Sequence, residues 1–142
     1  MASIVELRQM SNDKLTDMLE NSREEMFNLR FQKASARLEN TARLSEVRHE
    51  IAQLETVLHM RELAIEAAIE DPATVEALAD EEWRANARFV YEDSAWRVDF
   101  TDKAGKGLIT TYVDLNKSRP KGRRARRTKK QPQLVVGREE RA

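Results

Sequence analysis

The residues of this chain best suited to chemistry are the cationic side chains crowded into segment 117–130. Nine of its fourteen positions are Lys or Arg, a density of like charge that cannot be buried in a core. Against a phosphate backbone such a run releases counterions, and arginine adds forked phosphate contacts and stacking on splayed bases. Taken alone, the run is also typical of a solubilising tail, a nonspecific polyanion binder or a nuclear-import signal. The candidate phosphate contacts are Arg119, Lys121, Arg123, Arg124, Arg126, Arg127, Lys129 and Lys130.

Catalytic and metal-binding chemistry has little support elsewhere in the chain. His49 and Glu50 begin like the helical zinc-protease motif, but Gln53 stands where the second histidine is required. His59 lies about 80° away from His49 around a helix, so the two histidines do not converge on one metal ion. The turn 105–107 lacks the spacing of a phosphate-binding loop. We therefore predict a protein that is not an enzyme and that uses no metal or cofactor.

Charge is strongly segregated along the chain, although 25 basic and 25 acidic residues give a net charge of zero. Residues 1–70 carry nine Lys or Arg against thirteen Asp or Glu, a net charge of −4, and residues 71–116 carry a net charge of −5. Residues 117–142 carry eleven basic and two acidic side chains, a net charge of +9. These shifts divide the chain into three parts with boundaries near 70 and 116, of which the last is a basic tail.

Two matched heptad stripes predict that the first part is an antiparallel coiled-coil pair of helices. Stripe positions recur at alternating steps of three and four over 12–34, where Ser11 is placed as the N-cap, and again over 44–65. The segment 35–41 interrupts the pattern, and this short connection favours a hairpin within one chain over a dimer of chains. The main stripe residues are Leu15, Leu19, Met26 and Leu29, then Leu44, Val47, Ile51, Leu54, Leu58, Arg61 and Ile65.

The acidic middle part predicts a small α+β extension. Asp71 is a suitable N-cap with Pro72 in the first turn, so a short helix is expected there. Val75, Leu78 and Trp83 are expected to line this helix. Strands are expected over 88–91, 96–100 and 108–113, with a turn at 102–107. Trp83, Tyr91, Trp96 and Tyr112 are expected mostly in its small core, although aromatic rings of this kind also stack on RNA bases.

The fold class that follows is mainly α. A short leading helix, indicated by the spacing of Ile4, Leu7 and Met10, precedes the two-helix hairpin domain at 1–70. The α+β extension at 71–116 adds a short helix and a three-stranded meander, and the basic tail at 117–142 follows. Two helices of this size bury little surface, so the hairpin is expected to dock on a partner.

Residues on both sides of the bend also carry a family signature. The strings ELR (6–8), FNLRFQ (27–32), LENT (38–41) and VRHEIA (47–52) resemble the bacterial-type family of large-subunit ribosomal protein twenty-nine, over about residues 3–65. That family often has Gly-Gln where this chain has Ala36-Arg37. The missing glycine predicts a bend without a left-handed residue at that point, or a slightly longer helix. The family's hairpin is usually basic and this one is acidic, so the tail is expected to supply more of the RNA affinity.

The resemblance implies a structural role. Members of the family lie on the outside of the large ribosomal subunit near the exit of the nascent-peptide tunnel. They pack there against large-subunit rRNA and a neighbouring tunnel-rim protein, on a surface that receives chaperones and the signal recognition particle. By family match, one outer face of the hairpin is expected to bind this rRNA. Its residues are Arg8, Arg30, Gln32, Arg37, Asn40, Arg43 and Arg48.

Composition agrees with a cytoplasmic ribosomal protein. The absence of cysteine fits a reducing compartment, and the first ten residues show neither a secretory nor a transit-peptide pattern. No stretch approaches transmembrane length, so no membrane partner is expected. The acidic extension is better suited to a basic neighbouring protein than to RNA. The competing interpretation is a coiled-coil interaction protein, such as a nucleoid-associated one, with a nonspecific polyanion-binding tail.

Overall fold

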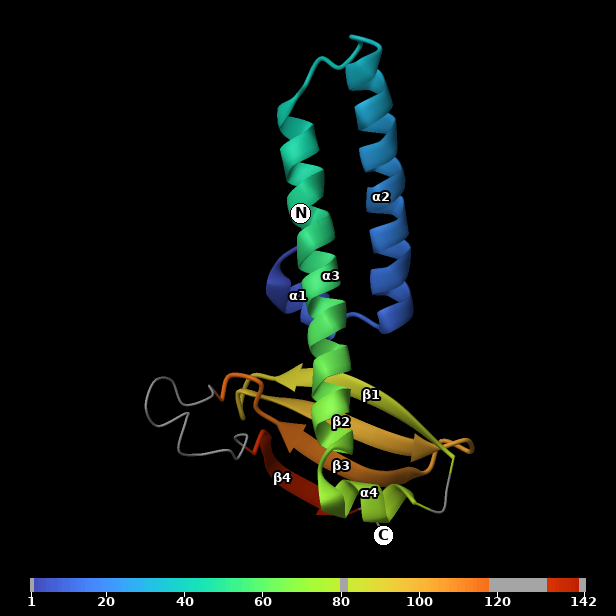
Figure 1. The fold of residues 1–142 in the computed structure, drawn as a ribbon, viewed down its shortest axis with the longest axis vertical. Coiled ribbons are helices and arrows are strands. Elements are labelled where there is room, and N and C mark those ends of the chain that lie inside the picture. The colour runs from blue at the N-terminus through green and yellow to red at the C-terminus, as the bar shows by residue number, and fades with distance from the viewer. Residues whose placement is uncertain (1, 80–81, 118–132, 141–142) are drawn as a thin grey trace, which may run out of the picture. The chain divides into compact units, whose positions relative to one another are not determined.

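The computed structural model describes residues 2–79, 82–117 and 133–140, and the chain forms two compact units. The first unit is Met1–Met60 and the second is Arg61–Ala142, so the longest helix contributes to both. The elements, shown in Figure 1, are α1 (Ile4–Gln9), α2 (Asn12–Ala34), α3 (Ala42–Ile69), α4 (Pro72–Leu78), β1 (Trp83–Val90), β2 (Ala95–Asp102), β3 (Gly107–Val113) and β4 (Val135–Glu140).

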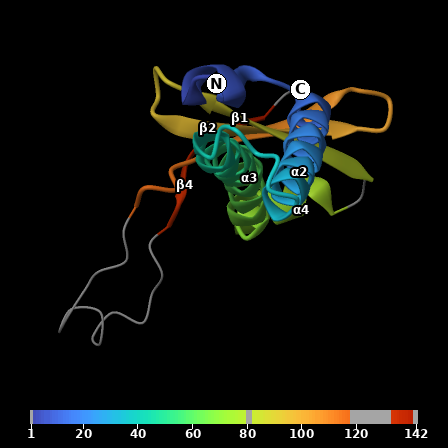
Figure 2. The same cartoon turned by 90° about the horizontal axis from the view of Figure 1, so that it is seen from above.

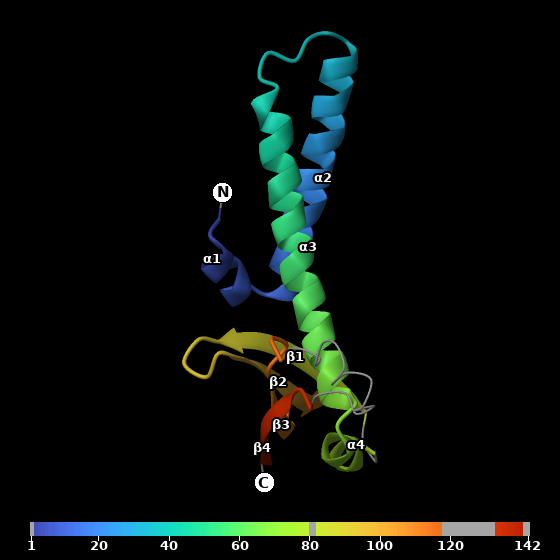
Figure 3. The same cartoon turned by 60° about the vertical axis from the view of Figure 1, so that its left-hand side comes forward.

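The first unit is a helical hairpin in which α2 and α3 run antiparallel, and Figure 2 shows them side by side from one end. α2 begins after Ser11, whose Oγ accepts a hydrogen bond from the Lys14 backbone N–H at 3.4 Å. A capping box between Ser3 and Glu6 starts α1, which folds back toward the hairpin (Figure 3). The predicted hairpin and leading helix are therefore confirmed.

Two apolar clusters hold the hairpin together. Near the bend, Met26 and Leu29 pack with Leu44 and Val47. At the other end, Leu7 of α1 joins a cluster whose further members are Leu15, Leu19, Leu54 and Val57. The predicted stripe contains Leu58, but Val57 is the more buried side chain, at 1 % exposure. A straight α-helix drifts by about 20° per heptad from an ideal seven-residue repeat, so the buried face moves to the neighbouring residue along α3.

Ala36 takes a left-handed backbone conformation at the bend, with φ 55°. The Arg37 N–H donates to the Gln32 carbonyl at 2.9 Å, and the Ala36 N–H donates to the Lys33 carbonyl at 3.1 Å. This pair of bonds is the Schellman motif, which satisfies the last carbonyls of a helix. The prediction that the bend lacks a left-handed residue here is therefore wrong. A side chain in this conformation costs about 1–2 kcal/mol, which the completed helix end offsets.

The second unit is a four-stranded antiparallel sheet in the order β1-β2-β3-β4, with α4 packed on β3. The register pairs three side chains of β2 with three of β3, and all six are at most 3 % exposed. These pairs are Trp96 with Val113, Val98 with Thr111 and Phe100 with Ile109. Ala64, Ala67 and Ala68 in the last turns of α3 are also buried, as is Leu78 of α4. These elements account for the core of the predicted α+β extension.

Three details of the extension differ from the sequence-based expectation. Trp83 begins β1 and does not lie on the short helix. Val75 is 49 % exposed, while Thr74 is buried and its Oγ1 lies 3.3 Å from Oγ1 of Thr111. The sheet also contains a fourth strand, β4, which pairs with β3. Its alternation is hidden because three of its six residues, Arg138 to Glu140, are charged.

The basic run at 118–132 lies outside the described residues, and so do all eight of the phosphate contacts predicted from Arg119 to Lys130. The described residues on its two sides lie close together. The Asp114 N–H donates to the Leu134 carbonyl at 2.9 Å, and Lys117 Nζ donates to the Gln133 carbonyl at 3.2 Å. The run therefore connects two neighbouring strands, and the part predicted as a tail also contains a strand of the sheet.

Candidate nucleic-acid interface

Two interhelical ion pairs identify opposite edges of the hairpin. On one edge, Arg43 Nε donates to Glu25 Oε1 at 2.6 Å and Arg43 Nη2 donates to Glu25 Oε2 at 2.9 Å. On the other, Arg23 Nη2 donates to Glu55 Oε1 at 2.7 Å. In an antiparallel pair, seven residues forward on one helix and seven back on the other reach the same edge, two turns away. We call these the Arg43 edge (Glu25, Arg43, Glu46, Glu50) and the Arg30 edge (Arg23, Arg30, Arg48, Glu55).

The single arginine of the Arg43 edge is surrounded by carboxylates. Beyond Glu25, Arg43 Nη1 lies 3.2 Å from Glu46 Oε2 and 3.8 Å from Glu50 Oε1. Hydrogen bonds to Glu25 and Glu46 raise the pKa of Arg43, and the guanidinium holds the pKa of the Glu25 carboxyl below its usual value. With three carboxylates around one cation, this edge is negative and repels phosphate.

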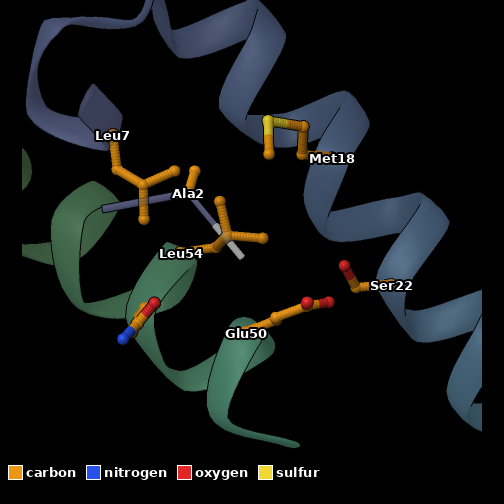
Figure 4. Close-up of a pocket in the computed structure, with 7 residues that line it drawn as sticks. Ala2, Leu7, Met18, Ser22, Glu50 and Leu54 are labelled. Atoms are coloured by element: carbon orange, nitrogen blue, oxygen red, sulfur yellow. The ribbon is translucent and has the colours of Figure 1, made fainter. Parts of the chain in front are cut away.

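A small cleft also opens beside Glu50 (Figure 4). It has a volume of about 190 Å³ and is lined by Ala2, Leu7, Met18, Ser22, Glu50, Gln53 and Leu54. In the close-up, Glu50 of α3 and Ser22 of α2 point toward one another, while Leu7, Met18 and Leu54 form the apolar end. The cleft has one acidic group and no cationic group for a phosphate.

The Arg30 edge has the opposite character. Arg30 lies seven residues after Arg23, and Arg48 lies seven residues before Glu55. Arg30 and Arg48 therefore lie opposite one another on this edge, two helical turns nearer the bend than the Arg23–Glu55 pair. Both are exposed. Within the part of the chain that the structure describes, neither is joined to a carboxylate by an ion pair or hydrogen bond. Two uncompensated cations at one level favour an anion from outside the chain.

The structure does not bring the predicted hairpin contacts onto one face. Gln32 lies seven residues after Glu25, so it is on the Arg43 edge and not on the edge of Arg30 and Arg48. Asn40 Oδ1 accepts the Ala42 N–H at 3.0 Å and helps to start α3. Arg37 is exposed in the bend, and Arg8 is half-buried in the last turn of α1. Family matching identifies such positions but does not say which edge each occupies.

Phe27 and Phe31 are exposed side chains that sequence reasoning did not consider as candidates for a site. Their side chains are 70 % and 66 % exposed, more than any other large apolar residue in the described part of the chain. They lie one turn apart on the outer side of α2, next in sequence to buried Met26 and exposed Arg30. The signal was available, since both fall outside the heptad stripe while belonging to the quoted family signature.

The aromatic residues of the extension are largely engaged with one another. Trp96 is 3 % exposed and contacts Phe89 edge-on, with ring centroids 5.3 Å apart. Trp83 is 38 % exposed but its ring contacts Phe100 in the same manner, at 5.4 Å. Tyr91 is 46 % exposed and contacts Phe89, at 4.8 Å. These rings support the sheet, which leaves the exposed phenylalanines of α2 as the better stacking candidates.

Neither a metal centre nor a membrane span is found in the described ranges. No three His, Cys, Asp or Glu side chains there are grouped closely enough to hold a metal ion. His49 Nδ1 lies 2.7 Å from the Ser45 carbonyl within its own helix. Across the same residues, no helix has both the length and the apolar character needed to cross a membrane.

Comparison with known proteins bears on the hairpin. A family model described as Ribosomal L29 protein matches residues 5–61, which include both edges and the two exposed phenylalanines. The chain is 47 % identical over 81 residues to the large ribosomal subunit protein uL29 of Frankia alni, covering 57 % of this chain and 88 % of that protein. Proteins of the same name from Mycolicibacterium gilvum and Rhodococcus erythropolis are 56 % and 53 % identical over 62 and 60 residues. These matches cover 44 % and 42 % of this chain, and 80 % and 77 % of those proteins.

Proposed function

The chain belongs to the ribosomal L29 protein family, and we propose that it acts within the large ribosomal subunit as a scaffold bound to rRNA near the exit of the nascent-peptide tunnel. It is a structural constituent of that subunit and not an enzyme. The observation that carries the rRNA proposal is the Arg30 edge. It lies inside the family-matched region and presents two arginines that no carboxylate of the described chain neutralises.

The charges of the two parts indicate that the hairpin and the basic run contribute differently to rRNA binding. The hairpin carries a net negative charge, so it sets shape and position through a few contacts at Arg30 and Arg48. The basic run between β3 and β4 supplies the larger, sequence-independent attraction to phosphate. Its eight proposed contacts lie outside the described residues, from Arg119 to Lys130. Arg43, in contrast, contributes by holding α2 and α3 together.

The remaining proposed partners are proteins. The hairpin is proposed to contact a neighbouring protein of the tunnel rim. Chaperones and the signal recognition particle are proposed to bind transiently at the same surface. The acidic extension is proposed to contact a basic neighbouring protein, because residues 71–116 carry a net charge of −5.

Sedimentation tests this function directly. A tagged full chain is expressed in cells, and lysates are centrifuged through sucrose gradients at high salt. We expect the chain to travel with large subunits, because a constituent of the particle resists salt that removes adventitious polyanion binders. A chain that stays at the top of the gradient, or that follows DNA, would support the competing coiled-coil interaction protein and overturn the proposal.

A further inference from the structure

We propose that the Arg30 edge and the exposed phenylalanines of α2 form one composite site for an unpaired rRNA segment. Bases stack on Phe27 and Phe31, and a phosphate of the same segment lies between Arg30 and Arg48. This inference rests on the proposed rRNA-scaffold function and specifies the chemical class of its contact.

Phe27 and Phe31 lie on the outer side of α2. Phe27 follows Arg23 by four residues, and Arg30 follows Phe27 by three, so these side chains are neighbours on one helix surface. Phe31 is one further turn from Phe27. The carboxylate-rich Arg43 edge is on the other side of α2, because Glu25 faces Arg43 there. Phe27 therefore lies beside the uncompensated Arg30, while Phe31 lies on the outer surface of α2, about 100° around the helix from Arg30.

This surface is unfavourable for the chain when no partner covers it. Phe27 is 70 % exposed and Phe31 is 66 % exposed, so most of their apolar surface stays in water. Such exposure is unfavourable unless a partner covers it. At the same place, the chain supplies Glu55 as a partner for Arg23 but no carboxylate for Arg30 or Arg48 within the described residues. The surface thus lacks two things, an anion and a flat apolar group. A nucleotide supplies both.

The four side chains suit an RNA partner better than a protein partner. Unpaired bases stack on aromatic side chains, and arginine forks bind their phosphates, which together define single-stranded RNA recognition. Phe27 and Phe31 are four residues apart, or roughly 6 Å along the axis, so both rings are within reach of neighbouring bases. An acidic protein segment would satisfy the arginines but would not require two aromatic rings. Inside an rRNA-rich particle, the nucleotide is the occupant that uses all four residues.

The test reconstitutes the full-length chain onto large subunits depleted of it, and measures binding by sedimentation at several KCl concentrations. We expect the double variant Phe27→Ala with Phe31→Ala to bind at least about fivefold more weakly at every salt concentration. A loss of about fivefold corresponds to the loss of one stacked base. Its salt slope should stay unchanged. Arg30→Gln should weaken binding and also lower the slope by about one, as expected when one phosphate is no longer bound.

Matched controls and a second readout keep the outcomes separate. Arg43→Gln removes an arginine of the opposite edge that is already paired with Glu25, and it should leave the salt slope of binding unchanged. Phe27→Leu with Phe31→Leu keeps apolar surface without stacking, so it should bind as weakly as the alanine variant. Ultraviolet crosslinking of the assembled subunit should attach a nucleotide to the peptide containing Phe27 and Phe31.

Three results would overturn the composite site. These are wild-type binding by the double alanine variant, recovery of binding by the leucine variant, or crosslinks from this peptide to a protein only. Each of them leaves the proposed function standing as long as the chain still sediments with large subunits. Failure of the wild-type chain to bind at all would instead remove the proposed function itself.

Discussion

Arg138 of β4 binds both carboxylate oxygens of Asp71, the N-cap of α4. Arg138 Nε donates to Asp71 Oδ2 at 2.6 Å, and Arg138 Nη2 donates to Asp71 Oδ1. Oδ2 also accepts the backbone N–H and the Oγ1 hydroxyl of Thr74, at 3.3 and 3.2 Å. Thr74 Oγ1 in turn lies 3.3 Å from Thr111 Oγ1 of β3. One buried carboxylate therefore joins α4, β3 and β4.

Removing this carboxylate should destabilise the second unit. We expect Asp71→Ala to lower its free energy of unfolding by about 1–2 kcal/mol, the usual cost of losing a helix N-cap. Both tryptophans, Trp83 and Trp96, lie in this unit, so their fluorescence during urea unfolding reports it separately from the hairpin. Glu76→Ala, an exposed change on the same helix, is the control and should stay within about 0.5 kcal/mol of wild type.

The same contact makes stability depend on pH. The guanidinium of Arg138, with further hydrogen bonds from Thr74, holds the pKa of the Asp71 carboxyl below its ordinary value of 3.8. A lowered folded-state pKa stabilises the fold fully above the unfolded-state value, and this contribution is lost as pH falls through the folded-state value. Arg138→Gln should therefore lower the urea midpoint at pH 7, and the difference from wild type should shrink below about pH 4. A deficit that is the same at all pH values would contradict the assignment.

The bend offers a stabilising substitution. Ala36→Gly should raise the free energy of unfolding of the hairpin by about 0.5–1 kcal/mol, because glycine takes the left-handed conformation without strain but loses more entropy on folding. Helical circular dichroism in urea measures this change. Ala34→Gly, at the last residue of α2, should instead lower stability by about 0.5–1 kcal/mol. Equal losses from both substitutions would show that φ at position 36 is not left-handed in solution.

The two hairpin edges should respond differently to arginine removal. Arg43→Gln breaks the forked bond to Glu25, so it should lower the urea midpoint of the hairpin while the salt dependence of subunit binding stays unchanged. Arg30→Gln should leave the midpoint near wild type and reduce the salt dependence, because Arg30 has no carboxylate partner in the described chain. The two measurements are made on the same purified variants. A reduced salt slope for Arg43→Gln would place RNA on the Arg43 edge instead.

The basic run can be tested without damage to the sheet. Deleting 117–142 would also remove β4 and the Arg138 contact, so the cleaner change replaces the eight basic residues from Arg119 to Lys130 with glutamine. Affinity for subunits should fall, and the slope of log K against log salt should decrease by about 0.7–0.9 for each phosphate that the variant no longer neutralises. Unchanged tryptophan fluorescence shows that the sheet is intact. A wild-type slope would remove the basic run from the interface.

Local patterns predict the hairpin well because their causes are local. Ser11 and the stripe from Leu15 to Leu29 locate α2 at 12–34, and a short connection leaves an antiparallel hairpin as the simplest arrangement. The shift of burial from Leu58 to Val57 depends on helix drift, which an ideal heptad ignores. Ala36 was mispredicted because conformational preference was weighed without the two backbone hydrogen bonds that the bend completes.

Non-local contacts explain what the sequence did not reveal. β4 is recognisable only through its pairing with β3 and through Arg138, whose partner lies 67 residues away. The family signature grouped its predicted RNA contacts on one outer face of the hairpin, but Gln32 and Arg43 fall on a different edge from Arg30 and Arg48. The compensating pairs Arg23–Glu55 and Glu25–Arg43 are what separate these edges, and they become visible once the helix register is known.

Arg30 and Arg48 place two positive charges opposite one another on the hairpin, which is unfavourable for the isolated fold. A hairpin selected only for stability would have a second ion pair, like Arg23–Glu55, at positions 30 and 48. The substitution Arg48→Glu would create that pair with Arg30. That single change should make the free protein harder to unfold and a worse ribosomal component. The present pair thus forgoes an interhelical ion pair in the isolated protein, and under the proposed function its charge is neutralised by rRNA instead.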